Sequence, residues 1–135
     1  MWYTAASLRG AVAEAFGRQG FLDRAAGFRV IQAVVRDATP VLDLVGLAPR
    51  ALRLTQEIAA TTDYLACQHW ARAFYDRYPE IRGLRWRGRQ SGSLCVMLHD
   101  RADMNRLDGE SWAMTDPAVW PRIARAARDC RLRVV

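Results

Sequence analysis

Five side chains that could do chemistry are Tyr3 and Glu14, eleven residues apart, and Arg85, Arg87 and Arg89, which alternate along one segment. A tyrosine ring can stack on a flat ring. A carboxylate can bind sugar hydroxyls and stabilise a positive charge that develops in a transition state. Guanidinium groups hold phosphate through paired, charge-assisted hydrogen bonds. These side chains can act together only if the fold brings them to one place.

Each of these residues also has an ordinary structural interpretation. Glu14 can be a solvated helix carboxylate that pairs with Arg18, four residues further along the same helix. Tyr3 can belong to the core or to its rim, and the three arginines can line one solvated face of a strand. Spacing alone leaves both interpretations open.

The composition excludes several other chemistries. All 20 basic residues are arginine, which excludes a lysine nucleophile and the lysine of a phosphate-binding P-loop. The cysteines form no Cys-x-x-Cys pair, and neither histidine has the spacing of a metal ligand. These residues are Cys67, Cys95, Cys130, His69 and His99. We therefore expect them to be structural, with no metal ion and no disulfide framework.

Length and composition predict a single domain over residues 1–135. Hydrophobic residues make up 51% of the 135, enough for a core without disulfides or metal. No apolar run approaches the roughly 18 residues of a membrane span, and the first residues lack the pattern of a signal peptide. We therefore expect a cytoplasmic protein with no membrane partner.

The elements that must position the candidate residues alternate between strand and helix. Strands are expected at 2–4, 28–36, 41–45, 84–87, 94–98 and 132–135. Helices are expected behind the N-cap Ser7, from Thr61 or Thr62 up to Pro79, and behind Asp116-Pro117. Segment 28–36 is apolar on both faces and predicts a buried strand, whereas 46–55 predicts a loop or short helix and 103–114 an irregular segment. The pattern indicates an α+β domain with a single mixed β-sheet and helices packed on it.

Two blocks of the sequence resemble the RES domain family. Residues 3–14, Tyr-Thr-Ala-Ala-Ser-Leu-Arg-Gly-Ala-Val-Ala-Glu, are similar to its signature of a Tyr at a strand end, then Ser-Leu and Ala, then a Glu in the next helix. Residues 83–90, Gly-Leu-Arg-Trp-Arg-Gly-Arg-Gln, resemble its second block, Gly-x-Arg-Tyr/Trp-x-Ser-Arg. Stretches 61–64 and 98–101 fit the same order, so the resemblance spans nearly the whole chain.

The resemblance implies an ADP-ribosyltransferase-like fold and an NAD-consuming toxin of a bacterial toxin–antitoxin pair. NAD would be the substrate rather than a cofactor, and cleavage of its nicotinamide–ribose bond passes through an oxocarbenium-like state. Glu14 would stabilise that cation and Tyr3 would stack on the nicotinamide. The substrate phosphates would lie along the second block, at Arg85, Arg87, Gly88 and Arg89. Water or inorganic phosphate would be the acceptor, with ADP-ribose transfer also open, and an Xre-type antitoxin would be the partner.

The chain departs from the family pattern in two places. The family's leading Arg lies upstream of the signature Tyr, in a segment that we expect this chain to lack because Tyr3 is its third residue. The Ser of the second block aligns with Gly88, and Ser91 or Ser93 is a weaker stand-in. We therefore expect a front-truncated or degenerate member with weakened catalysis and an unpaired strand edge or exposed apolar patch near the N-terminus.

Two alternatives to an NAD-degrading toxin remain open. The first is a non-catalytic RES-like module that still binds an Xre-type antitoxin. The second is a nucleic-acid-binding domain, suggested by a net charge of +6 and a pI of about 10.0. The arginines are spread along the sequence, and no RNP, helix-turn-helix or zinc-finger pattern occurs, so this alternative ranks last.

Overall fold

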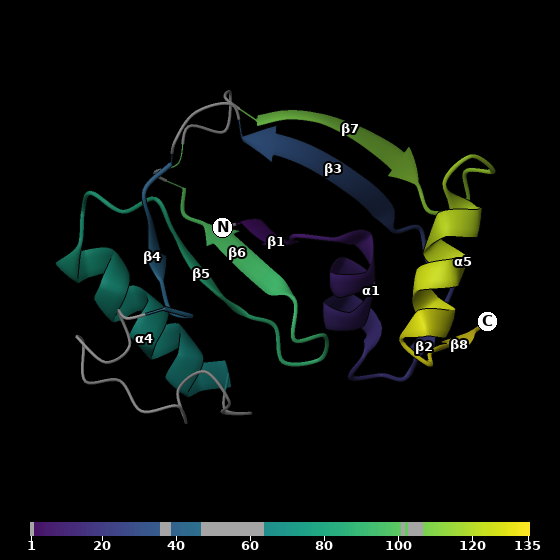
Figure 1. Ribbon diagram of the computed structural model, residues 1–135, viewed down its shortest axis with the longest axis horizontal. Coiled ribbons are helices and arrows are strands. Elements are labelled where there is room, and N and C mark those ends of the chain that lie inside the picture. The colour runs from purple at the N-terminus through teal and green to yellow at the C-terminus, as the bar shows by residue number, and fades with distance from the viewer. Residues whose placement is uncertain (1, 36–38, 47–63, 101, 103–106) are drawn as a thin grey trace.

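The computed structural model describes residues 2–35, 39–46, 64–100, 102 and 107–135 (Figure 1). Its largest sheet has four strands in the order β1-β6-β5-β4. They are β1 (Trp2–Ala5), β6 (Leu94–Leu98), β5 (Gly83–Arg87) and β4 (Val41–Asp43). The pairs β1/β6 and β6/β5 are antiparallel, and β4/β5 is parallel. The expected mixed sheet is therefore confirmed, and β1 forms one of its edges, as expected near the N-terminus.

Three helices occur among the described residues, so the α+β class is confirmed. They are α1 (Leu8–Phe16), α4 (Tyr64–Arg77) and α5 (Trp120–Asp129). Helix α1 begins behind Ser7, whose hydroxyl accepts a hydrogen bond from the Gly10 amide at 3.1 Å, as the capping pattern predicted. Helix α4 ends two residues before Pro79. None of the helices in the described part of the chain is long and apolar enough to cross a membrane.

Two strand pairs lie outside the four-stranded sheet. Strand β2 (Phe21–Leu22) pairs in parallel with β8 (Arg133–Val134), and β3 (Arg29–Val35) pairs antiparallel with β7 (Leu107–Ala113). The β3/β7 ribbon arches above α1 in Figure 1. Two sequence predictions fail here: β3 is not a buried strand, and 107–113 is not irregular. A two-stranded ribbon leaves much of both faces to solvent, and Ile31 and Val34 are 55% and 58% exposed.

The last helix begins later than the sequence predicted. Val119 is its N-cap residue and Pro121 lies in its first turn, whereas the expected cap, Asp116, belongs to a preceding turn. The Asp116 carboxylate accepts a hydrogen bond from the Ala118 amide at 2.8 Å and so stabilises that turn. Most of segment 46–55 and the expected start of the middle helix at 61–62 lie outside the described residues.

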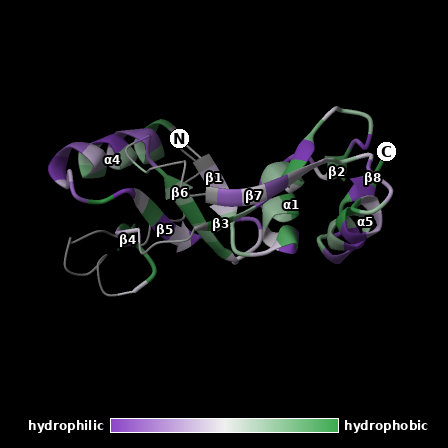
Figure 2. Cartoon of the chain, turned by 90° about the horizontal axis from the view of Figure 1, so that it is seen from above, coloured by the Kyte–Doolittle hydropathy of each residue, from purple (hydrophilic) through white to green (hydrophobic). Residues whose placement is uncertain are grey.

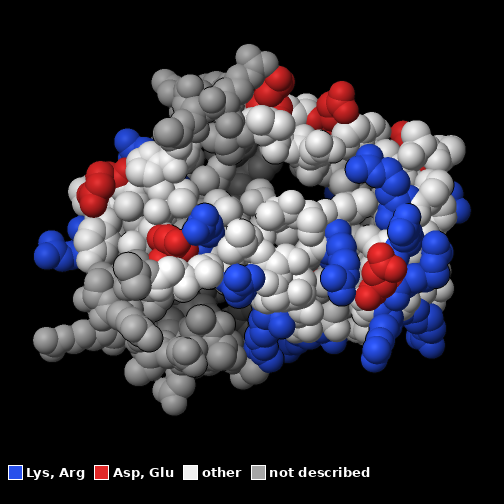
Figure 3. Space-filling view, in the orientation of Figure 1, with Lys and Arg blue, Asp and Glu red and all other residues white. Residues whose placement is uncertain are grey.

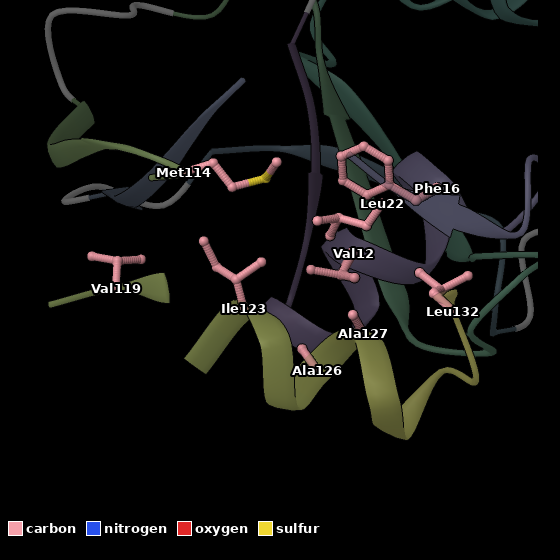
Figure 4. Close-up of a cluster of buried hydrophobic side chains, with 9 residues drawn as sticks. All are labelled: Val12, Phe16, Leu22, Met114, Val119, Ile123, Ala126, Ala127 and Leu132. Carbon is pink, nitrogen blue, oxygen red and sulfur yellow. The ribbon is translucent and has the colours of Figure 1, made fainter. Parts of the chain in front are cut away.

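Two hydrophobic clusters hold these elements together. The larger joins α1 to α5 and to the short β2/β8 pair (Figure 4). Its buried members are Val12, Phe16, Leu22, Met114, Val119, Ile123, Ala126, Ala127 and Leu132. The smaller packs α4 on the four-stranded sheet through Phe74, Ile81, Leu84 and Met97. Figure 2 shows that α4 and α5 lie at opposite ends of the molecule, with β6, β1 and α1 between them.

Candidate active site

The carboxylate of Glu14 is fixed by the loop that joins β5 to β6. Glu14 lies in the second turn of α1, and its Oε1 accepts hydrogen bonds from the backbone amides of Gln90 and Ser91 at 2.9 and 2.8 Å. The Ser91 hydroxyl donates a third, also at 2.8 Å. Among the described residues these three donors all reach Oε1, which leaves Oε2 for another partner. Glu14 is therefore held by the loop between β5 and β6, and it is not simply a solvated carboxylate on the surface of α1.

Two glycines let α1 and the loop approach this closely. A Cβ on Gly88 would clash with Oε1 of Glu14 and would lie 2.6 Å from its Cδ and 2.7 Å from Cys95 Sγ. A Cβ on Gly10 would lie 2.9 Å from the Cβ of Ser93. All three distances are shorter than real side chains show, so glycine at these two positions is a steric requirement of the contact between α1 and the loop.

The loop is itself ordered by local hydrogen bonds. The Gly88 amide donates to the Ser93 carbonyl at 2.8 Å, and the Gly92 amide donates to the Gly88 carbonyl at 2.8 Å. The Ser91 hydroxyl, besides donating to Glu14, accepts a hydrogen bond from the Ser93 amide at 3.0 Å. Gly92 has φ +64°, a conformation that glycine adopts without strain. Glu14 is therefore held by donors that cannot easily reorganise.

Cys95 lies close to the Glu14 carboxylate, since both border the same side of Gly88. The Cys95 side chain is buried, and its Sγ donates a weak hydrogen bond to the Ser93 carbonyl at 3.7 Å. Burial raises the pKa of the Cys95 thiol, and the negative charge of Glu14 raises it further. The thiol is therefore protonated at neutral pH, which suits a structural group better than a nucleophile.

The strand register places Tyr3 on the same face of the sheet as Cys95. Tyr3 lies opposite Met97, and Trp86 lies opposite Cys95, so the side chains of all four alternate onto one face. Tyr3 is 69% exposed, and its ring meets the ring of Trp86 edge-on, with centroids 6.4 Å apart. Helix α1 packs against this same face, since Gly10 lies against Ala5. Two aromatic rings and the Glu14 carboxylate thus border one face of the sheet.

The same alternation puts Arg85 and Arg87 on the opposite face. Arg85 pairs with Asp43 across β5 and β4 through hydrogen bonds of 2.7 and 3.2 Å. This ion pair holds the pKa of the Asp43 carboxyl below its ordinary value. Arg87 donates to the carbonyl of Gly92 at 3.1 Å, at the end of the loop. The structure therefore separates these two arginines from the Tyr3 face.

Arg89 occupies a different position, within the loop itself. It is exposed and directly precedes Gln90, whose amide binds Glu14. The role of the two loop amides was not expected from the sequence, and Ser91 was expected only as a weaker stand-in for the family's serine. A short, glycine-flanked loop between two strands was visible in the sequence, but nothing in it indicated which carboxylate its amides would bind. In the part of the chain that the structure describes, no group of three His, Cys, Asp or Glu residues is placed to hold a metal ion.

Comparison with known families matches residues 1–120 to the RES domain. This chain belongs to the RES domain family. No curated protein and no solved structure matches it. Membership associates the chain with an NAD-related, toxin-type function at the level of the family. The matched region includes the Tyr3–Glu14 block, β5 and its loop, so the fixed carboxylate lies inside the RES domain.

The RES match ends where α5 begins. Helix α5 starts at Trp120, and β8 follows it, so nearly all of this C-terminal unit lies beyond the matched residues. The unit still belongs to the fold, because the buried face of α5 packs on α1. The position of α1, and therefore of Glu14, depends in part on packing against α5, most of which lies outside the matched residues.

Proposed function

We propose that this RES domain degrades NAD by cleaving the nicotinamide–ribose bond, with Glu14 and Tyr3 as its catalytic residues. The observation that supports this most directly is the Glu14 carboxylate, held through Oε1 by three donors of a short loop. A carboxylate fixed before the substrate arrives stabilises a developing cation without reorganising at the moment of reaction. Its second oxygen, Oε2, is the atom that we assign to the ribose.

In the proposed reaction the bond between C1′ of the ribose and the nicotinamide nitrogen breaks. The electron pair of that bond goes to the nitrogen, and neutral nicotinamide leaves. The oxocarbenium-like ribose is stabilised by the negative charge of Glu14. An oxygen of water or inorganic phosphate then bonds to C1′ and releases its proton to solvent. Tyr3, beside Trp86, offers an exposed aromatic surface against which the nicotinamide ring can pack.

Among the arginines of the second block, we assign the substrate phosphates to Arg89. It lies in the loop next to the donors that hold Glu14, whereas Arg85 and Arg87 lie on the other face of the sheet. Gly88 offers no functional group to the substrate, and its lack of a side chain leaves room for the Glu14 carboxylate. Because a serine is expected at this position in the family and Gly88 provides no hydroxyl, we expect turnover to be slow. A cytoplasmic location, where NAD is available, and an Xre-type antitoxin partner complete the proposal.

The test is release of nicotinamide from NAD, measured with and without inorganic phosphate. Glu14→Gln should lower the rate by about 10²–10³, because the amide keeps the shape but loses the charge that stabilises the cation. Glu80→Gln is the matched control, because Glu80 is exposed and its substitution removes the same charge outside the site. Equal rates for both variants, or the absence of both NAD binding and turnover at high protein concentration, would refute the proposal.

The absence of a serine hydroxyl at position 88 favours a second candidate function. If the missing hydroxyl is essential, the domain would bind an Xre-type antitoxin without turning over NAD. Calorimetric NAD binding separates the two, because a degenerate enzyme retains a Glu14-dependent NAD site and a purely protein-binding module does not.

A further inference from the structure

The outer face of α5 carries a row of arginines that the proposed catalysis does not use. Arg122, Arg125 and Arg128 are exposed at every third position of the helix, and Arg131 and Arg133 follow it. Figure 3 shows basic side chains gathered over the end of the molecule where α5 lies. Only one acidic residue, Asp129, occurs between 118 and 135. We call Arg122, Arg125, Arg128, Arg131 and Arg133 the α5 arginines.

Packing of the helix fixes the direction of this row. The opposite face of α5 is buried against α1 through Ile123, Ala126 and Ala127 (Figure 4). Because a helix rises about 1.5 Å per residue, the stretch from Arg122 to Arg128 spans about 9 Å. The three guanidinium groups are therefore presented to solvent on a rigid support.

The charge of this row is not neutralised by the part of the protein that the structure describes. None of the α5 arginines forms an ion pair with a described residue, whereas Arg72 and Arg85 elsewhere pair with carboxylates at 2.9 and 2.7 Å. Arg9 is also exposed and adds to the same end, because its carbonyl accepts a weak hydrogen bond from Cys130 at 3.6 Å. Like charges held together repel one another, so the row favours an anionic partner.

We propose that the α5 arginines bind the phosphate backbone of double-stranded nucleic acid. Guanidinium groups bind phosphate in a bidentate manner, and a row of them on a rigid helix can follow successive phosphates. Unstacked bases are not expected as ligands, because Trp120 is half-buried and Arg24 covers its ring at 4.6 Å. Protein interfaces usually centre on exposed apolar anchors, and no large apolar side chain of α5 is exposed. The binding should therefore be electrostatic and independent of base sequence.

The test is fluorescence anisotropy with a labelled 20-base-pair duplex over a series of salt concentrations. The affinity of the unmodified protein should fall steeply with salt, and in R122Q/R125Q/R128Q the log–log slope should be shallower by about 2.7, since each phosphate contact contributes about 0.9. At 100 mM salt the triple variant should bind on the order of 10²-fold more weakly. R72Q/R77Q/R82Q, which removes the same charge around α4, should retain the affinity. Thermal melting checks that both variants fold, and the single variant R125Q provides a milder change with a slope shift of about 0.9.

Three results would overturn this proposal. The first is no binding to the duplex at 50 mM salt. The second is an equal loss of affinity in the two triple variants, which would make net charge the cause. The third is competition by poly-glutamate as effective per charge as the duplex, which would indicate an acidic protein partner instead. Nicotinamide release is independent of this experiment, so either proposal can fail alone.

Discussion

Placing a serine at position 88, the residue type that the family pattern has there, should damage the site rather than restore it. A Cβ at this position would clash with Oε1 of Glu14 and would lie 2.7 Å from Cys95 Sγ. Neither neighbour can withdraw freely, because Glu14 is held by three hydrogen bonds and Cys95 is buried. Overpacking of this kind costs about 1–3 kcal/mol.

The cost converts into a measurable change in melting temperature. An unfolding entropy of about 2.1 cal/mol/K per residue over 135 residues makes 1 kcal/mol equivalent to about 3.5 °C. Gly88→Ser should therefore lower Tm by about 4–11 °C. The amides of Gln90 and Ser91 should also exchange hydrogen faster, because displacement of the Glu14 carboxylate removes their acceptor. Nicotinamide release should not rise above that of the unmodified chain.

A double-mutant cycle isolates the cause. In a Glu14→Ala background the Oε1 and Cδ atoms are gone, so Gly88→Ser should cost less there, with a coupling energy of about 0.5–3 kcal/mol. The contact with Cys95 Sγ persists and accounts for the remaining cost. An unchanged Tm together with unchanged exchange at Gln90 and Ser91 would show that the loop adapts freely, and the steric argument would then be wrong.

Three further predictions concern the core, a thiol and an ion pair. Ile123→Ala should lower the free energy of unfolding by about 2–5 kcal/mol, because Ile123 is 0% exposed between α5 and α1; a loss below 1 kcal/mol in denaturant melts would contradict this packing. Cys95 should react with a thiol reagent more slowly than the two half-buried cysteines, since burial and Glu14 raise its pKa; mass spectrometry of the modified peptides measures the order, and Cys95 reacting first would refute it. The pKa of Asp43 is lowered by Arg85, so the stability from this pair is present at neutral pH and is lost as the pH falls through that lowered pKa. Asp43→Asn should therefore cost at most about 1 kcal/mol at pH 7, because the pair is partly exposed, and nothing in strong acid; an equal cost at both pH values would exclude the linkage.

Local signals in the sequence predicted the elements that carry the candidate residues. The capping residue Ser7 and the apolar stripe of α1 predicted the helix of Glu14. The alternating segment 84–87 and the apolar run 94–98, joined by a loop with two glycines, predicted β5 and β6. Strand β7 was missed because the centre of its sequence, Leu-Asp-Gly-Glu-Ser-Trp-Ala, is polar and contains a glycine, which is not typical of a strand. Its strand conformation depends on seven register pairs with β3, which are tertiary contacts and have no local signature.

The candidate site shows the same division between local and distant information. The sequence identified Glu14 and the second block, but the contact between them joins residues 76 and 77 positions apart. Whether Arg85 and Arg87 could bind the substrate depended on which face of the sheet they occupy. The alternating sequence alone does not determine that face, because it follows from the register with the neighbouring strand. With Arg85 opposite Val96 and Trp86 opposite Cys95, the face with the aromatic residues is separated from the face with the arginines.

The arginines illustrate how a fold can create a feature that the sequence hides. Five of the 20 arginines lie between residues 122 and 133, but they do not form a continuous basic run, so the sequence alone did not favour nucleic acid over a general basic composition. In α5 the residues Ile123, Ala126 and Ala127 pack against α1. Because of the helical repeat, Arg122, Arg125 and Arg128 then lie on the exposed side of the helix. The same packing that supports the Glu14 helix from one side thus exposes a positive surface on the other. Since α5 packs directly on α1, the two proposed sites lie on neighbouring helices that share one hydrophobic cluster.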